Sequence, residues 1–253
     1  MHWEAKLNSV IDAFNLYFEM ISADTDVLKQ EVYKLRYQVY CLETGFEDPK
    51  QYPLGLEFDE YDQYAKHYLI RHRRTGEYAA TTRMILASPN RLNAEFPLER
   101  YFQIDDYSVL GKLNRSHLGE ASRLCVSKTF KQRKSEQTLQ GIENTSSDYF
   151  LPDERRVFPH ISFALIACLI KACDENHITH FFGTLEPAWF RFLSAAGIHF
   201  TKIGPLIDYH GMRWPGLIKV SDLLDGVADK KPEIWQLLTD RGRYCQSTEI
   251  VCT

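Results

Sequence analysis

Charged side chains stand within apolar stretches at four places in this sequence. They are Arg36, the pair Asp59 and Asp62, Arg83, and the pair Glu120 and Arg123. A charge inside a strand or a packed helix is costly unless it is paired or faces water. One interpretation is a set of solvent-facing residues on a half-exposed sheet. The other is a partly buried network whose members balance one another and position a substrate. Spacing alone leaves both open.

The hydrophobic pattern indicates the elements that would carry these residues. Apolar residues recur in steps of four and three from Leu28 to Leu42, which predicts a helix over 26–42 with Arg36 on it. Ahead of it we expect a helix over 4–16 and a strand over 17–22. Strand patterns follow over 67–72, 78–86 and 118–126, and the last two would carry Arg83 and the Glu120/Arg123 pair.

Helical and strand patterns alternate in the second half of the chain. We expect a buried helix over 156–176, a strand over 179–185, a helix from Pro187 that ends before Gly197, a strand over 199–206, a turn-rich stretch over 209–215 and two short closing helices. This order predicts an α/β fold, a mixed central sheet with helices on both faces. The polar stretch 127–155 is interpreted as an insertion within a single domain spanning residues 1–253.

Composition excludes several classes of protein. The 253 residues are 44% hydrophobic and 25% charged, as in globular proteins, and the net charge of −4 gives no reason to expect nucleic-acid binding. The N-terminus lacks a signal-peptide layout, and the longest apolar run, 161–170, is about half the ~20 residues that span a bilayer. We therefore expect a cytoplasmic protein without a transmembrane segment. The six cysteines and nine histidines lack metal-ligand spacing, so no metal site is predicted.

An ordered set of eight residues resembles the signature of the acyl-homoserine-lactone (autoinducer) synthases. That signature is an arginine, two aromatics, an Asp-x-x-Asp pair, a second arginine and a Glu-x-x-Arg pair, matched here by Arg36, Tyr40, Phe46, Asp59, Asp62, Arg83, Glu120 and Arg123. The wording of 32–41 and 119–126 looks closer still to the acyltransferases associated with the PEP-CTERM/exosortase system, which are similar to long-chain N-acyl amino acid synthases. The match covers about residues 17–126.

The resemblance implies a GNAT-like fold. In that family an acyl-carrier-protein thioester enters a V-shaped opening of the sheet, and a small amine attacks its carbonyl. By the match, six residues order the N-terminal segment over the acceptor, namely Arg36, Tyr40, Phe46, Asp59, Asp62 and Arg83. Glu120 and Arg123 would then lie beneath the reaction centre. We expect Glu120 to handle the amine proton, with a salt bridge to Arg123 as the alternative role. Backbone N–H groups at the opening are the expected oxyanion donors.

The sequence departs from the family in two ways. Phe46 stands where the lactone synthases use a tryptophan near S-adenosylmethionine, which argues against lactone formation. The glycine-containing pyrophosphate loop of acetyl-CoA enzymes is missing from 127–132. We therefore expect no tightly bound cofactor and a donor delivered as acyl-phosphopantetheine on acyl-carrier protein. The basic residues beyond the last strand of the match are either a solvated loop or a docking site for that acidic carrier: Lys128, Lys131, Arg133 and Lys134.

Three functions remain. The first is an N-acyltransferase that moves a fatty acyl group, expected to be long-chain, from acyl-carrier protein to an amino acid or similar small amine. The second is an acyl-homoserine-lactone synthase. The third is a non-catalytic GNAT-like module that binds acyl chains or carrier proteins. Detection of an acylated product separates the enzymes from the binding module.

Overall fold

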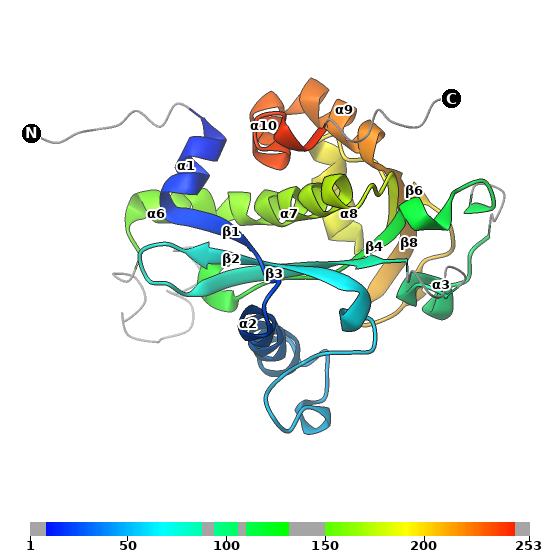
Figure 1. Ribbon diagram of the computed structural model, residues 1–253, viewed down its shortest axis with the longest axis horizontal. Helices are drawn as coiled ribbons and strands as arrows, with labels where there is room; N and C mark the ends of the chain where they lie inside the picture. The colour runs from blue at the N-terminus through cyan, green and yellow to red at the C-terminus, as the bar shows by residue number, and fades with distance from the viewer. Residues whose placement is uncertain (1–8, 88–93, 106–109, 132–149, 246–253) are drawn as a thin grey trace, which may run out of the picture.

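The computed structural model describes residues 9–87, 94–105, 110–131 and 150–245. A sheet with the strand order β1-β2-β3-β4-β5-β8-β6 lies at the centre of this part, and β7 pairs with β8. Neighbouring strands are antiparallel except β4 and β5, which are parallel. Helices lie on both faces of the sheet (Figure 1). The predicted mixed α/β fold is confirmed.

The elements have the following bounds. The strands are β1 (Phe18–Ser22), β2 (Ala65–His72), β3 (Tyr78–Leu86), β4 (Leu118–Val126), β5 (His180–Leu185), β6 (Thr201–Lys202), β7 (Ile207–Asp208) and β8 (Met212–Lys219). The helices are α1 (Val10–Tyr17), α2 (Asp26–Arg36), α3 (Pro97–Tyr101), α6 (Pro152–Val157), α7 (Ile161–Glu175), α8 (Pro187–Ala195), α9 (Val220–Lys230) and α10 (Pro232–Thr239). A π-helical segment, Tyr37–Glu43, continues α2.

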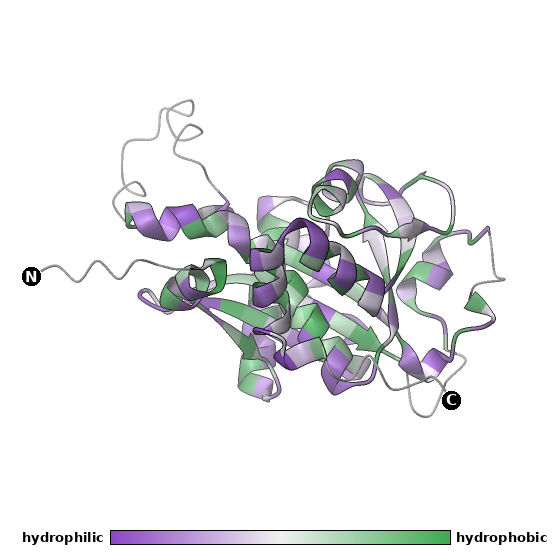
Figure 2. Cartoon of the chain, turned by 90° about the horizontal axis from the view of Figure 1, so that it is seen from above, coloured by the Kyte–Doolittle hydropathy of each residue, from purple (hydrophilic) through white to green (hydrophobic). Residues whose placement is uncertain are grey.

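The main hydrophobic core lies between the sheet and α7. This helix is apolar around most of its circumference because the sheet, α1 and α10 surround it. The helical stretch Pro152–Glu175 is long and apolar enough to cross a membrane, but 61% of its most apolar window is buried inside the fold. Coloured by hydropathy, the helices over this face carry both hydrophobic and hydrophilic residues (Figure 2).

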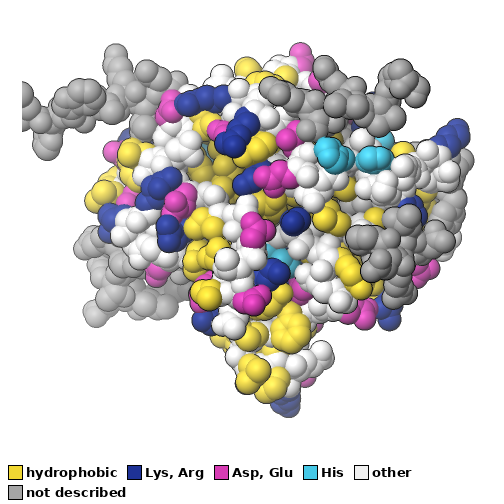
Figure 3. All heavy atoms as spheres, viewed as in Figure 1, with side chains coloured by type: hydrophobic (Ala, Val, Ile, Leu, Met, Phe, Trp, Pro, Cys, Tyr) yellow, Lys and Arg dark blue, Asp and Glu magenta, His cyan; other side chains and the backbone are white. Residues whose placement is uncertain are grey.

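A smaller core lies on the opposite face, under α2. Val32, Leu35 and Val39 project from one side of the helix and pack against Leu69 of β2 and Cys125 of β4. Fully burying a side chain of this kind contributes about 1.5–3 kcal/mol, so this contact holds α2 on the sheet. The Lys, Arg, Asp and Glu side chains visible in Figure 3 are interspersed rather than gathered by sign.

The sheet parts between β4 and β5. Their parallel pairing runs from Leu118 and His180 to Ala121 and Gly183, and it ends there although β4 continues to Val126. Beyond that point β4 pairs with β3, and β5 pairs with β8. We call this place the β4–β5 split. The V-shaped opening that the family resemblance implied is expected at this place.

Two sequence predictions near the C-terminus are wrong. The strand expected over 199–206 shrinks to β6, because the chain must pass the Gln103 carbonyl at Gly204, where a Cβ would lie 2.1 Å from that oxygen. The stretch expected to be turn-rich, 209–215, instead contains the first half of β8. Pro215 suggested a turn, yet the ring takes a place opposite Thr184 and its carbonyl accepts from Ile203. The expected helix over 4–16 begins at Val10, and residues 1–8 lie outside the described ranges.

Candidate active site

Arg36 is the first member of a buried ionic network. The Thr25 hydroxyl caps α2 by accepting from the Leu28 N–H at 3.3 Å, and the apolar side of the helix then turns Arg36 toward the sheet. Its side chain is 1% exposed. Nε donates to the Glu57 carboxylate, and Nη1 donates to Asp62 at 2.7 Å. The helix therefore delivers a charge into the interior together with two partners.

Arg83 is the second arginine of the network. It projects from β3 toward the α2 face and is 2% exposed. Nη1 and Nη2 bind the two oxygens of Asp59 at 2.6 and 2.8 Å, and Nη1 also binds Asp62 at 2.6 Å. Nε donates to the Ser122 hydroxyl at 2.8 Å. Such bidentate pairing fixes the Asp59–Asp62 turn over the sheet.

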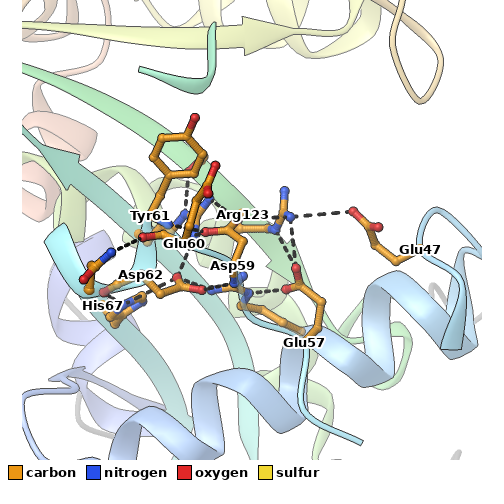
Figure 4. A network of polar contacts seen from close by, with 12 residues as sticks. Glu47, Glu57, Asp59, Glu60, Tyr61, Asp62, His67 and Arg123 are labelled. Carbon is orange, nitrogen blue, oxygen red and sulfur yellow. Dashed lines mark hydrogen bonds and ion pairs between the residues drawn. The ribbon is translucent and has the colours of Figure 1, made fainter. Parts of the chain in front are cut away.

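Arg123 completes the network from a bulge in β4. Its φ of 53° is left-handed, and the register between β3 and β4 shifts at this point. The bulge redirects the side chain, so that Nε and Nη2 donate to Glu57 at 3.1 and 2.9 Å. The Tyr40 ring lies 5.5 Å from the guanidinium carbon. The network is seen from close by in Figure 4.

The carboxylates of the network are ionised. Burial alone would raise the pKa of Glu57, but the charges of Arg36 and Arg123 hold it below the ordinary value. Burial opposes ionisation of Asp62 too, and Arg36 with Arg83 holds its pKa far below the ordinary range. Three arginines thus face three carboxylates, counting Asp59, whose pKa Arg83 likewise lowers against burial. The charges balance within the interior.

The network also holds a neutral histidine. His67 on β2 is 2% exposed, and its Nε2 lies 3.3 Å from the backbone oxygen of Asp62. Burial lowers the pKa of His67 to about 4, against the opposing charge of Asp62. At neutral pH this ring is uncharged and supports the Asp59–Asp62 turn rather than adding a fourth cation.

Glu120 lies apart from the network on the same strand as Arg123. It is 3% exposed, and its Oε2 accepts from the backbone N–H of Leu98 in α3 at 2.9 Å. Burial raises the pKa of Glu120 to about 8, despite the Leu98 N–H and the charge of Arg83, which lower it. A carboxyl group with that pKa can take up and release a proton near neutral pH.

The structure decides two questions that spacing left open. The solvent-facing interpretation is wrong for four of the predicted residues, since each is buried: Arg36, Asp62, Arg83 and Glu120. The alternative salt bridge between Glu120 and Arg123 is also wrong within the described residues. Glu120 bonds to Leu98, whereas Arg123 is turned by the bulge toward Glu57 and Asp59.

The two aromatic residues of the match lie at different depths. Tyr40 is in the π-helical segment, against Arg123, and burial raises the pKa of its hydroxyl well above the ordinary value. A π-helical turn is an uncommon feature that often accompanies functional sites. Phe46 is 39% exposed, and its ring centroid lies 6.1 Å from that of His210.

The basic stretch is only partly within the described ranges. Lys128 and Lys131 are exposed in the turn that follows β4. Arg133 and Lys134 lie outside the described residues. The Lys128 N–H donates to the Glu43 carboxylate at 2.8 Å, so the turn is held against the π-helical segment.

Sequence reasoning missed Glu57. This residue is 0% exposed and binds both Arg36 and Arg123, which makes it the link between the helix and β4. The available signal was its position two residues before Asp59, between Leu56 and Phe58, where an unpaired charge would have been costly. The turn between β7 and β8, with Tyr209 and His210, was also missed, because its residues come from the far end of the chain.

Comparisons with known proteins agree with this geometry. Residues 35–140 match the family profile described as acetyltransferase (GNAT) domain. The chain has a GNAT-like fold. A comparison with the curated proteins finds no significant match.

Three solved structures share this fold, and two of them, BjaI and LasI, are described as acyl-homoserine-lactone synthases. TofI, in a ternary complex with an inhibitor and MTA, aligns with a TM-score of 0.57 at 16% identity over 86% of this chain and 99% of TofI. BjaI, a CoA-dependent acyl-homoserine lactone synthase with SAM and isopentyl-CoA, gives 0.55 at 17% over 89% of this chain and 88% of BjaI. The AHL synthase LasI gives 0.52 at 18% over 83% of this chain and 96% of LasI. At these identities the likeness concerns the fold.

Proposed function

We propose that this chain is an N-acyltransferase that moves a fatty acyl group from a thioester to the amine of an amino acid or similar small molecule. The observation that carries the proposal is the position of Glu120. The buried carboxyl group of Glu120 has a pKa of about 8, and the Glu120 backbone lies opposite Phe182 of β5 just before the β4–β5 split. A proton acceptor thus lies where an opening strand pair can receive a thioester. We treat residues 1–253 as one acyltransferase domain acting in the cytoplasm.

The proposed reaction is a direct transfer. The neutral amine attacks the thioester carbonyl, a C–N bond forms, and the C–S bond breaks. The nitrogen gives one proton to the Glu120 carboxylate, and the departing thiolate takes up one proton, so no net proton is consumed. Backbone N–H groups of β4 beyond Ala121, where the ladder to β5 has ended, are the proposed donors to the oxyanion. Removing one such donor typically costs about 10²–10³ in rate.

We further propose acyl-carrier protein as the donor. A CoA diphosphate needs free backbone N–H groups at the end of β4. Here the N–H groups of that turn have partners within the fold, since Ser127 donates to Ala79 and Lys128 donates to Glu43. The Glu43 carboxylate would also repel a diphosphate at this position. BjaI is CoA-dependent, so the fold alone does not choose the donor.

The acceptor proposal favours an amino acid over S-adenosylmethionine. Phe46 replaces the tryptophan expected beside adenosine, and its ring contacts the ring of His210. The resemblance to PEP-CTERM/exosortase-associated acyltransferases points the same way, toward N-acyl amino acid products. Acyl-homoserine-lactone synthesis remains the second candidate because solved lactone synthases share the fold.

Mass spectrometry tests the proposal directly. Purified protein is incubated with lauroyl-acyl-carrier protein and either a mixture of amino acids or S-adenosylmethionine. N-lauroyl amino acids are the expected products, and lipid extracts of a host that expresses the chain should contain the same class of compound. N-lauroyl homoserine lactone alone would favour the second candidate. A complete absence of acylated product, with the carrier protein still bound, would return the chain to the class of binding modules.

A further inference from the structure

Arg123 is held in a strained and fixed orientation. A left-handed φ is unfavourable for a residue with a long side chain, and it persists where the surrounding structure imposes it. The buried Glu57 carboxylate binds its Nε and Nη2, and the Tyr40 ring lies against the guanidinium carbon. Such strain often accompanies a functional role.

One nitrogen of Arg123 is left over. Asp59 and Glu47 approach Nη2 at 3.4 and 3.6 Å, and none of the described residues bonds to Nη1. Figure 4 shows this outer nitrogen pointing away from Glu57 without a dashed contact. The side chain is 24% exposed, whereas Arg36 and Arg83 are 1% and 2% exposed. Of the three network arginines, only Arg123 can offer an N–H group to a ligand from solvent.

The turn between β7 and β8 lies near Arg123. Its Tyr209 ring packs on Phe102 at 5.3 Å, and the adjacent His210, with φ of 51°, approaches Phe46 at 6.1 Å. Tyr209 is close enough to Arg123 and Glu120 for both charges to act on its hydroxyl. The turn therefore contacts Phe46 of the N-terminal segment and lies within electrostatic range of Arg123.

We propose that Nη1 of Arg123 binds the carboxylate of an α-amino acid acceptor whose apolar side chain packs against the outer surface of the contact between Phe46 and the Tyr209–His210 turn. The inference rests on the proposed function and narrows its acceptor to zwitterions with a large apolar side chain. A planar guanidinium fixed by Glu57 is preorganised for a carboxylate. Glu47 supplies an anionic neighbour for the ammonium group of the same molecule. In this arrangement Arg123 is a binding residue, and proton transfer is left to Glu120.

The test compares acceptors that differ only in the carboxylate. Wild-type protein receives lauroyl-acyl-carrier protein with phenylalanine, phenylalaninamide or phenethylamine, at equal concentrations of free amine. A hydrogen bond to a charged group makes the expected KM for phenylalanine roughly 10- to 100-fold lower than for the other two. Arg123→Gln should remove this preference by raising the KM for phenylalanine while leaving that for phenethylamine within a few-fold. Phe46→Ala should raise the KM for phenylalanine but not for glycine.

Arg71→Gln is the matched control. Arg71 is also a strand arginine paired with a glutamate, Glu19, but its side chain is 42% exposed on β2. The control should keep the wild-type preference. Equal KM values for phenylalanine and phenethylamine in wild type, with acylation of both, would overturn the carboxylate site and leave the acyltransferase standing. Losses in Arg123→Gln that are equal for all acceptors would reduce Arg123 to a structural role. No acylation of any acceptor would refute the proposed function itself.

Discussion

The Glu120 carboxylate accepts a hydrogen bond from the backbone N–H of Leu98 and not from Arg123, which lies three residues further along the same strand. The two residues form a single motif in the sequence, but the bulge between them sends their side chains to different partners. Burial raises the pKa of Glu120 to about 8, and no cation among the described residues binds its carboxylate directly. Arg123 is free of Glu120 and can complete the ionic network. Under the functions proposed above, the motif combines a proton-transfer group, Glu120, and an anion-binding group, Arg123.

Replacing Glu120 with glutamine should lower the acyl-transfer rate by roughly 10²–10⁴, the usual contribution of general acid–base catalysis. Glutamine keeps the size of the side chain and its acceptor oxygen for Leu98, so the fold should persist. The wild-type rate should rise with pH and level off above about 8, where the carboxylate predominates. The measurement is kcat for both proteins between pH 6 and 9. If Glu120→Gln shows the wild-type pH profile, Glu120 takes no part in proton transfer.

Glu120→Gln should lower the rate but raise the stability of the folded protein at high pH. The pKa of Glu120 is about 8 in the folded protein and near 4.5 in the unfolded chain. Between these values the unfolded chain has lost a proton that the folded protein retains, so unfolding releases a proton and wild-type stability falls as pH rises. Glu120→Gln should flatten this decline and unfold at higher denaturant concentration than wild type at pH 8. Denaturant titrations at pH 5 and pH 8 check it. A decline with the same slope in both proteins would contradict the assigned pKa.

Arg83→Ala should abolish activity and destabilise the protein. It leaves Asp59 without its main partner and Asp62 with Arg36 alone, and breaking a buried pair in this way costs ~3–5 kcal/mol. Arg100→Ala is the control, because Arg100 pairs with Glu60 in an ion pair whose side chains are 51% and 64% exposed. An exposed pair of this kind contributes little to stability, so the control should unfold at nearly the wild-type temperature. Thermal unfolding and turnover of the two variants give the comparison, and near-normal turnover in Arg83→Ala would exclude the network from function.

Glu57 should account for part of the sensitivity to acid. Its pKa is lowered in the folded protein, so its contribution to stability is present above the ordinary value of 4.5 and is lost as pH falls below it. Glu57→Gln should be less stable than wild type at pH 7, and the difference should shrink toward pH 3. Glu60→Gln, which alters an exposed carboxylate, should follow the wild-type curve. Parallel curves for Glu57→Gln and wild type would refute the assigned role.

Local patterns predicted most of the sheet and the helices that cover it. Apolar steps along 26–42 predicted α2 with its continuation, and the strand-like pattern over 78–86 predicted β3 with the bounds observed. The prediction was wrong for β8, where the register with β5 accommodates Pro215 despite its turn signal. Tertiary pairing, which no local pattern contains, decided that strand.

The residues of the candidate site were likewise predicted only in part. The ordered motif identified arginines and aspartates that the fold then brings within hydrogen-bond distance. It did not contain Glu57, whose importance depends on two arginines that are 21 residues before and 66 residues after it. Nor could spacing show that a bulge at Arg123 would separate it from Glu120. These features arise from three-dimensional register rather than from residue type.

The donor can be tested through the turn that follows β4. We expect lauroyl-acyl-carrier protein to outperform lauroyl-CoA, because the N–H groups of Ser127 and Lys128 have partners and cannot hold a diphosphate. The exposed Lys128 and Lys131 would instead attract the acidic surface of the carrier. Such attraction is screened over ~8–10 Å at 0.1–0.15 M salt, so the rate with the carrier should fall as salt is added.

Charge reversal completes this prediction. The double variant Lys128→Glu and Lys131→Glu should lower kcat/KM for the carrier-bound donor and its salt dependence, while sparing a short lauroyl-pantetheine thioester. Adding Arg133→Glu and Lys134→Glu should deepen the loss. The control reverses Lys230 and Lys231, which lie at the junction of α9 and α10. Initial rates with each donor at low and moderate salt provide the measurement. If lauroyl-CoA is used as well as the carrier, or if the reversal affects every donor alike, the basic turn is not a docking site, and the acyltransferase proposal then stands on Glu120 and the β4–β5 split alone.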